Sequence, residues 1–227
     1  RQRVDDRLQR AAGRKDALIT QDEPVATRGA RYIEFLIPGL LGMNIMSSSM
    51  WSIGWVVAES RRRKLLKRMM ATPLRRSHFL ASFVLARLVF LVAEGASIVA
   101  FGWLVFDVVP QGSLLAMTLL CLVGSMAFAG LSLLTACRSE NPETVSGLMN
   151  LVIMPMFVLS GVFFSSALFP DWMQPAIKAL PLTILVDALR AVVNQGASLV
   201  ASLIPLGFLT AWMAASFALA LRLFRWS

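Results

Sequence analysis

The stretch ESRRRKLLKRMMATPLRRSHFL, residues 59–80, lies between two strongly apolar blocks and indicates how the chain is organised. Eight of its side chains are Arg or Lys, and Glu59 is the only acidic one. Loops on the cytoplasmic side of a membrane carry such an excess of positive charge close to the ends of the spanning helices. The stretch therefore predicts a cytoplasmic loop between two membrane spans.

The composition of the whole chain points the same way. Its 227 residues are 57% hydrophobic, whereas soluble domains are about 45–50% apolar. The excess is concentrated in blocks, which indicates membrane spans rather than a larger soluble core. The net charge is +9, and a basic chain can bind nucleic acid. The sequence outside the blocks cannot build a soluble basic face, so we expect no nucleic-acid partner.

Cysteine and histidine are too few and too scattered for a disulfide framework or a metal centre. Cys121 and Cys137 belong to one apolar segment, which excludes a disulfide scaffold. His78 lies in the basic loop without Cys or acidic residues at ligand spacing. We therefore expect no metal site and a solvated loop histidine. Because the sequence begins with Arg rather than Met, we also expect the native start to be missing.

Five apolar blocks are long enough to cross a hydrocarbon core of about 30 Å at about 1.5 Å per residue. They cover residues 33–58, 79–109, 114–136, 145–164 and 199–221. Residues 1–31 are polar with mixed charge and predict a soluble segment, and residues 32–227 form the membrane domain. The fold predicted is an all-α polytopic helix bundle with five spans.

One further apolar stretch, AIKALPLTILVDALRAVVNQG at residues 176–196, contains charged residues near its middle. A charge at the centre of a spanning helix costs about 2.5–3.5 kcal/mol on insertion scales. Asp187 and Arg190 are three residues apart, share one face of a helix and are expected to pair. We therefore interpret 176–196 as a re-entrant or interfacial helical segment that does not cross.

The distribution of Lys and Arg sets the direction of the spans. With residues 59–78 in the cytoplasm, five crossings bring Arg222 and Arg225 to the cytoplasmic side, as the positive-inside rule requires. A sixth crossing at 176–196 would place both outside. The same count puts residues 1–31 outside, where their eight basic residues fit the rule poorly. We expect a multi-pass protein of the cell (inner) membrane, with a missing upstream span that makes six.

No enzyme constellation is present in the sequence. It lacks G-x-x-x-x-G-K-[ST], so the chain supplies no phosphate-binding loop of its own. No Ser/His/Asp set and no paired carboxylates can be argued, so we predict no enzymatic activity. A secondary carrier, the alternative interpretation, needs a coupling-ion site of buried ionisable residues or broken helices. Glu94 is the one residue that could contribute to such a site.

Glu94 lies near the middle of the second predicted span, and two interpretations of it stay open. An ionisable group at that depth is a functional candidate by default, here a polar point on a transport path. The other interpretation is a structural group that is hydrogen-bonded to a neighbouring helix. Arg87 lies two turns away, about 10 Å along the helix, which is too far for a direct pair.

Two prolines lie inside predicted spans and are expected to kink them, because each removes one backbone hydrogen bond. Small residues beside them predict closely packed helices. The positions are candidates for hinges or for the transport path, although packing alone would also explain them. They are Pro38, Gly39, Pro155, Ser160 and Gly161.

Four stretches, in order and at matching spacing, resemble the type-2 permease subunits of ATP-binding-cassette exporters. They are YIEFLIPGLLGMNIMSSSMW, the basic loop quoted above, ENPETVSGLMNLVIMPMFVLSGVFF and FPDWMQPAIKALPLTILVDALR. The resemblance extends from about Tyr32 to the end of the chain. It departs from the family after Glu59, where a Gly-Thr pair often follows soon and this chain has Ser60-Arg61-Arg62-Arg63-Lys64.

The resemblance implies six helices per subunit, a second permease as partner, and a cytoplasmic ATPase beneath each permease. ATP and Mg²⁺ are expected on that ATPase, and no cofactor is expected in this chain. The implied cargo is amphipathic, drug-like or lipid-linked.

The resemblance also implies that the basic loop docks a short helix into a groove on the ATPase. In the sequence, an apolar patch within a basic rim suits such a contact, and Pro73 ends the short helix. A loop that merely rests on anionic lipid would carry similar charge. The residues assigned to docking are Glu59, Arg61, Arg62, Arg63, Lys64, Leu65, Leu66, Lys67, Arg68, Met69, Met70, Thr72 and Pro73.

Overall fold

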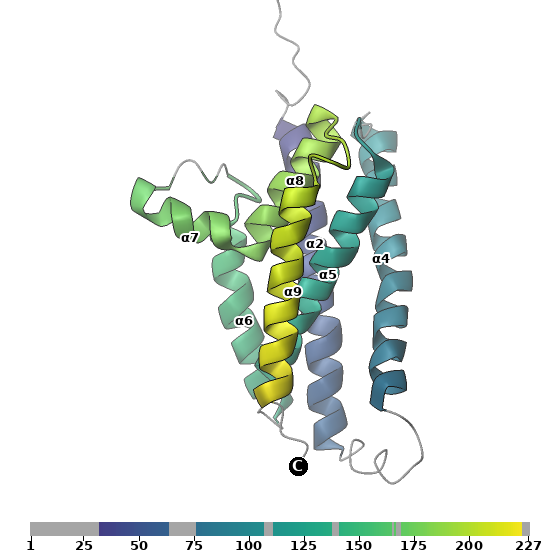
Figure 1. Ribbon diagram of the computed structural model, residues 1–227, viewed down its shortest axis with the longest axis vertical. Coiled ribbons are helices and arrows are strands. Elements are labelled where there is room, and N and C mark those ends of the chain that lie inside the picture. The colour runs from purple at the N-terminus through teal and green to yellow at the C-terminus, as the bar shows by residue number, and fades with distance from the viewer. Residues whose placement is uncertain are drawn as a thin grey trace, which may run out of the picture.

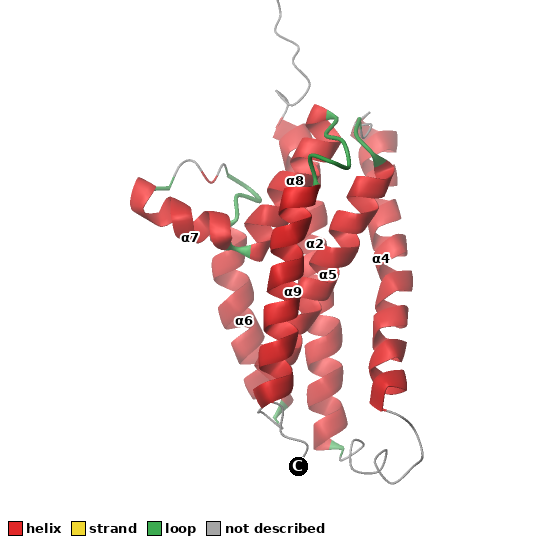
Figure 2. Ribbon diagram, in the orientation of Figure 1, coloured by secondary structure: helices red, strands yellow, loops and turns green. Residues whose placement is uncertain are grey.

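The computed structural model describes residues 32–63, 76–106, 111–137, 141–164, 166 and 169–223, without the side chains of 61, 76–84, 87 and 88. The described residues form helices and connections, with no strand among them (Figure 2). Within the described part of the chain, five helices are long and apolar enough to cross a membrane. They are α2 (Tyr32–Arg62), α4 (Arg76–Phe106), α5 (Leu114–Ala136), α6 (Pro142–Leu159) and α9 (Leu203–Leu223). The predicted all-α bundle with five spans is confirmed.

The five long helices run up and down along one common direction (Figure 1). We call the end at which α2 finishes and α4 begins the loop end, and the opposite one the far end. The helices α5 and α9 begin at the far end and finish at the loop end, where α6 begins (Figure 1). The predicted alternation of the spans therefore appears directly in the arrangement of the helices.

The core lies between α2 and α5, which pack against each other and against most of the remaining helices. Their inward faces contribute fully buried side chains, among them Leu41, Ile45, Met46, Leu120 and Phe128. By contrast, α4 and α9 bury few of their side chains and expose large apolar ones. Such exposure would be costly in water but suits helices that contact lipid.

Two glycines let α2 approach its neighbours closely. A Cβ atom on Gly42 would lie 2.6 Å from the Val186 side chain, and one on Gly39 would lie 2.8 Å from the carbonyl oxygen of Val162. Real Cβ atoms do not come this close, so a larger side chain at either position would require α2 or its neighbour to shift. Small residues at helix contacts serve this purpose in membrane proteins.

The segment between α6 and α9 differs in detail from the predicted spans. Helix α6 ends at Leu159 rather than at residue 164, and α9 begins at Leu203 rather than at residue 199. The early end of α6 arises at Gly161, whose φ of +72° is left-handed and stops a helix. Between them lie a short 3₁₀ helix (Asp171–Met173), α7 (Gln174–Ala179) and α8 (Pro181–Gln195).

The predicted re-entrant segment consists of two helices rather than one. Pro181 has no N–H with which to continue α7, and it occupies the first turn of α8, where none is needed. The result is an elbow at Leu180, after which α8 runs to Gly196 (φ +68°), a left-handed cap. Near its end, the carbonyl oxygens of Val192 and Val193 accept hydrogen bonds from the connection between α4 and α5.

One hydrogen bond fixes how far this segment reaches into the bundle. The indole N–H of Trp212 donates to the carbonyl oxygen of Ala179, at 2.9 Å, and Trp212 lies nine residues after Leu203. Nine residues correspond to about 13 Å along α9. The elbow therefore lies close to the middle of α9, and α8 returns from there to the far end (Figure 1). Its position in a membrane stays a prediction.

Candidate functional site

Residues from two of the predicted sets meet near the far end of the bundle. Arg190 of α8 lies between the first turns of α2 and the turn that follows α6. We call Phe35, Gly161, Asp187, Arg190 and Asn194 the Arg190 junction. The sequence analysis placed Gly161 and Arg190 in separate sets, whereas the structure joins them.

The guanidinium group of Arg190 binds two backbone segments and one ring. Its Nη2 donates to the carbonyl oxygen of Gly161 at 2.6 Å, and its Nε donates to that of Phe35 at 3.3 Å. Its central carbon lies 3.6 Å from the centre of the Phe35 ring. A planar, permanently charged group with several donors suits this combination of carbonyl binding and stacking. Only 13% of the side chain is exposed.

Pro38 explains why a carbonyl oxygen of α2 is available to accept a hydrogen bond from α8. Because proline has no N–H, the carbonyl oxygen of Glu34, four residues earlier, loses its partner within the helix. The side-chain amide of Asn194 donates to that oxygen at 3.0 Å. Asn194 lies one turn after Arg190, on the same face of α8. The predicted disturbance at Pro38 is therefore compensated by a second helix.

The turn after α6 supplies the third part of the junction. Gly161 has a left-handed backbone, and its carbonyl oxygen accepts a hydrogen bond from Arg190. Ser160 is completely buried, and its hydroxyl has no hydrogen-bond partner among the described residues. Pro155 lies inside α6 and is exposed, away from these contacts.

Asp187 contributes less to the junction than its pairing with Arg190 suggests. The two side chains approach to 3.5 Å between Oδ1 and Nη1, but that of Asp187 is 57% exposed. Exposed ion pairs stabilise a protein by about 0–1 kcal/mol. Backbone contacts, rather than this pair, hold Arg190.

Glu94 lies between α4 and α2, where it accepts a hydrogen bond from Ser48. The distance from the Ser48 hydroxyl to Oε2 is 2.9 Å. One turn earlier on α2, the side-chain oxygen of Asn44 is buried without a hydrogen-bond partner among the described residues. The contact with Ser48 favours the structural interpretation of Glu94, because it joins a sparsely buried helix to the core. The transport-path interpretation stays open.

The structural interpretation makes a testable prediction for Glu94. Replacing Glu94 by alanine should lower the free energy of unfolding by about 1 kcal/mol, the usual size of an interhelical hydrogen bond in a membrane protein. Glu94→Gln keeps an acceptor oxygen and should retain both stability and transport. Thermal unfolding in detergent and vesicle transport measure the two effects, with Ser48→Ala as the matched variant. If the Glu94→Gln protein folds but does not transport, the charge of Glu94 would instead be needed on the transport path.

The loop end is described only in part. Glu59 binds Arg62 at 2.9 Å and Arg63 at 2.6 Å, which are pairs within one helical turn on an exposed surface. They add little stability, but they extend α2 into the basic stretch. The side chain of Arg61 and the docking residues from Lys64 to Pro73 lie outside the described part, so docking stays a prediction.

Phe35 and Asn194 are functional candidates that the sequence analysis missed. The signal for Asn194 was present, because a proline inside a helix leaves a carbonyl group that needs a donor from elsewhere. Nothing in the sequence alone indicated which residue would provide it.

Residues 10–194 match the model of the ABC-2 type transporter family, which covers most of the chain. A search of curated proteins gave no match. The membrane component of such a transporter is the permease and not the ATPase, and it generally pairs with a cytoplasmic ATP-binding-cassette ATPase. Five helices able to span a membrane fit that role. The chain therefore belongs to the ABC-2 type transporter family and is a multi-pass permease subunit of an ATP-binding-cassette transporter.

Proposed function

We propose that the chain is the permease of an exporter, that it forms the translocation path together with a second permease, and that a separate ATPase drives it. The ATPase binds ATP and Mg²⁺ and docks on the loop that follows α2. The loop end faces the cytoplasm of a cell (inner) membrane, and residues 1–31 lie outside. The Lys and Arg residues between the first two spans support this orientation.

The observation that carries the mechanism is the continuity of α2. This helix runs without a break from Tyr32, beside the Arg190 junction, to Arg62, where the basic loop begins. Its 31 residues correspond to about 46 Å. It also packs against α4, α5, α6 and α8. A displacement of the loop would therefore be transmitted along α2 to its first turns, which contact α8 and, through Arg190, the turn after α6.

An amphipathic, drug-like or lipid-linked cargo is supported by the scarcity of charge in the spans. The sequence has no charged residue in 114–136 or in 203–221, and Glu94 is the only one in 89–106. A strongly hydrophilic cargo would require more polar partners along its path. Translocation then needs a rearrangement of helices rather than a water-filled channel.

The test is ATP-driven uptake into inside-out vesicles that contain the permease and its ATPase. A fluorescent amphipathic amine and a fluorescent lipid serve as probes. We expect accumulation of at least one of them with ATP and none without the ATPase. Accumulation that follows an ion gradient and needs no ATP would contradict the proposal, because it would indicate a secondary carrier.

Single cysteines in a variant without Cys121 and Cys137 test the topology. A cysteine at Thr144, exposed at the loop end, should react only with a reagent that enters the cytoplasm. Cysteines at Asp171 and Ser198, on either side of α7 and α8, should both react with an impermeant reagent added outside. Labelling of Asp171 and Ser198 from opposite sides would show that the segment crosses. Outside labelling at Thr144 would reverse the orientation.

A further inference from the structure

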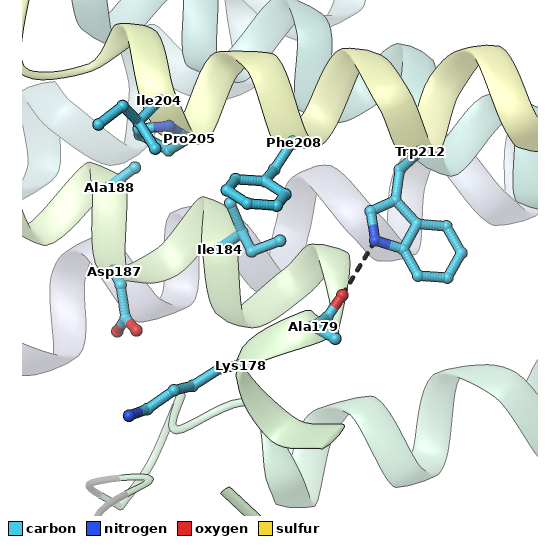
Figure 3. A pocket seen from close by; sticks show the side chains of 9 residues that line it. All are labelled: Lys178, Ala179, Ile184, Asp187, Ala188, Ile204, Pro205, Phe208 and Trp212. Atoms are coloured by element: carbon cyan, nitrogen blue, oxygen red, sulfur yellow. Dashed lines mark hydrogen bonds between the residues drawn. The ribbon is translucent and has the colours of Figure 1, made fainter. Parts of the chain in front are cut away.

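A cavity of about 410 Å³ opens between the elbow of α7 and α8 and the first half of α9 (Figure 3). Its walls are mainly apolar and include Ile184, Ala188, Ile204 and Phe208. Trp212 bounds one end, where its N–H is occupied by the carbonyl oxygen of Ala179. The volume lies within the range of small-molecule sites, about 300–1,000 Å³. We call this cavity the α8–α9 groove.

The groove runs along a helix that is able to span a membrane. Ile204 lies at the beginning of α9 and Trp212 eight residues later, so the apolar wall is about 12 Å long in the direction of the helix axis. Ile204 is 72% exposed and Phe208 is 59% exposed. Side chains exposed on a spanning helix contact acyl chains, which lie along the same direction. We therefore expect the hydrocarbon of one leaflet to surround the groove.

Two opposite charges lie at the open side of the groove. The side chains of Lys178 and Asp187 extend to the same side, away from α9 (Figure 3). Lys178 is exposed and forms no ion pair with another described residue. Asp187 is 57% exposed, with Arg190 at 3.5 Å. Ionisable groups beside a hydrocarbon surface are costly unless a partner of opposite charge is present.

We propose that the α8–α9 groove binds one phospholipid with an amine-bearing headgroup. Its phosphate pairs with Lys178, its ammonium group pairs with Asp187, and one acyl chain lies along Ile204 and Phe208 toward Trp212. Phosphatidylethanolamine has these two charges, and its ammonium group can donate hydrogen bonds to a carboxylate. Phosphatidylglycerol lacks the amine and would leave Asp187 without a partner in the lipid. The proposal rests on the walls and charges of the groove and does not depend on the chain being an exporter.

Native mass spectrometry of the purified full-length chain measures this binding directly. The probes are phosphatidylethanolamine, phosphatidylglycerol and free phosphoethanolamine, each titrated into delipidated protein in detergent. We expect one phosphatidylethanolamine per chain, with weaker binding of phosphatidylglycerol and no binding of the free headgroup. Lys178→Ala should weaken binding about fivefold, the usual effect of one cation near a lipid surface. Lys178→Arg should retain it.

A second pair of variants tests the apolar wall. Ile204→Trp fills the groove and should abolish retention of the lipid. Leu219→Trp places the same side chain on an exposed position of α9 outside the groove and should leave binding unchanged. Gel filtration checks folding, and Lys178→Ala alters only an exposed side chain. Equal occupancy in the two tryptophan variants would overturn the site. If phosphatidylglycerol bound as tightly as phosphatidylethanolamine, the assignment of an amine-bearing headgroup would be wrong. Tight binding of free phosphoethanolamine would show a soluble ligand instead.

Discussion

Replacing Arg190 by alanine is expected to lower the free energy of unfolding by about 3 kcal/mol and to abolish transport. The substitution leaves the carbonyl oxygen of Gly161 without its donor in a largely buried site and removes the second, longer contact with the carbonyl oxygen of Phe35 in α2. A buried polar group without a partner costs about 1–3 kcal/mol, and a shielded cation–π contact contributes up to about 2 kcal/mol. For a chain of this size, the expected loss lowers the melting temperature by roughly 6–12 °C.

Two further variants separate the contacts of Arg190 from its charge. Arg190→Lys keeps the charge but not the planar fork, so we expect it to recover only part of the stability. Arg222→Ala removes an exposed arginine at the end of α9 and should unfold like the unmodified protein. The measurements are thermal unfolding in detergent and ATP-driven transport in vesicles. An Arg190→Ala protein as stable as Arg222→Ala would contradict the structural role of the junction.

Replacing Leu66 and Met69 together by aspartate is expected to abolish binding of the ATPase and, with it, transport. The two residues are three positions apart and would share one face of a short docking helix. Burying two carboxylates in an apolar contact costs several kcal/mol if they stay charged. The permease itself should remain folded in the membrane. Pull-down of the ATPase measures the effect, and gel filtration in detergent controls for folding.

Neutralising Arg75 and Arg76 is the matched control for the docking experiment. Charges at the rim of an interface act mainly on the rate of encounter, so assembly should become slower and less dependent on salt while binding persists. If the double aspartate variant still binds the ATPase and transports normally, the docking interpretation is wrong. The basic loop would then act only as a signal for topology.

The number of candidate spans and their helical type could be predicted because length and hydropathy decide them. A block such as Leu114–Ala136 has few alternatives in a membrane, and the helix begins and ends at the residues predicted. The boundaries failed where backbone conformation decides them. Gly161 ends a helix through its positive φ, and Pro181 ends one because it has no N–H. Neither effect can be read from the length and hydropathy of an apolar block.

Three members of the Arg190 junction, Gly161, Asp187 and Arg190, were candidates from the sequence, but most of their connections could not be predicted. Asp187 and Arg190 were expected to pair because helical spacing brings them together. The stronger contacts of Arg190 are to carbonyl oxygens 29 and 155 residues away in the chain. Backbone acceptors have no signature of their own in a sequence, since every residue carries one. Only Pro38 marked the place at which a carbonyl group would need an external donor.

The Arg190 junction also has a consequence for the order of synthesis. Phe35 and Arg190 are 155 residues apart, so at roughly 5–20 residues per second the ribosome makes α8 about 8–30 s after the start of α2. During that interval the carbonyl oxygen of Glu34 lacks the amide that later satisfies it. The contact between α2 and α8 therefore forms only after a large part of the bundle has been synthesised. The first turns of this permease thus reach their final contacts only when the second half of the chain arrives.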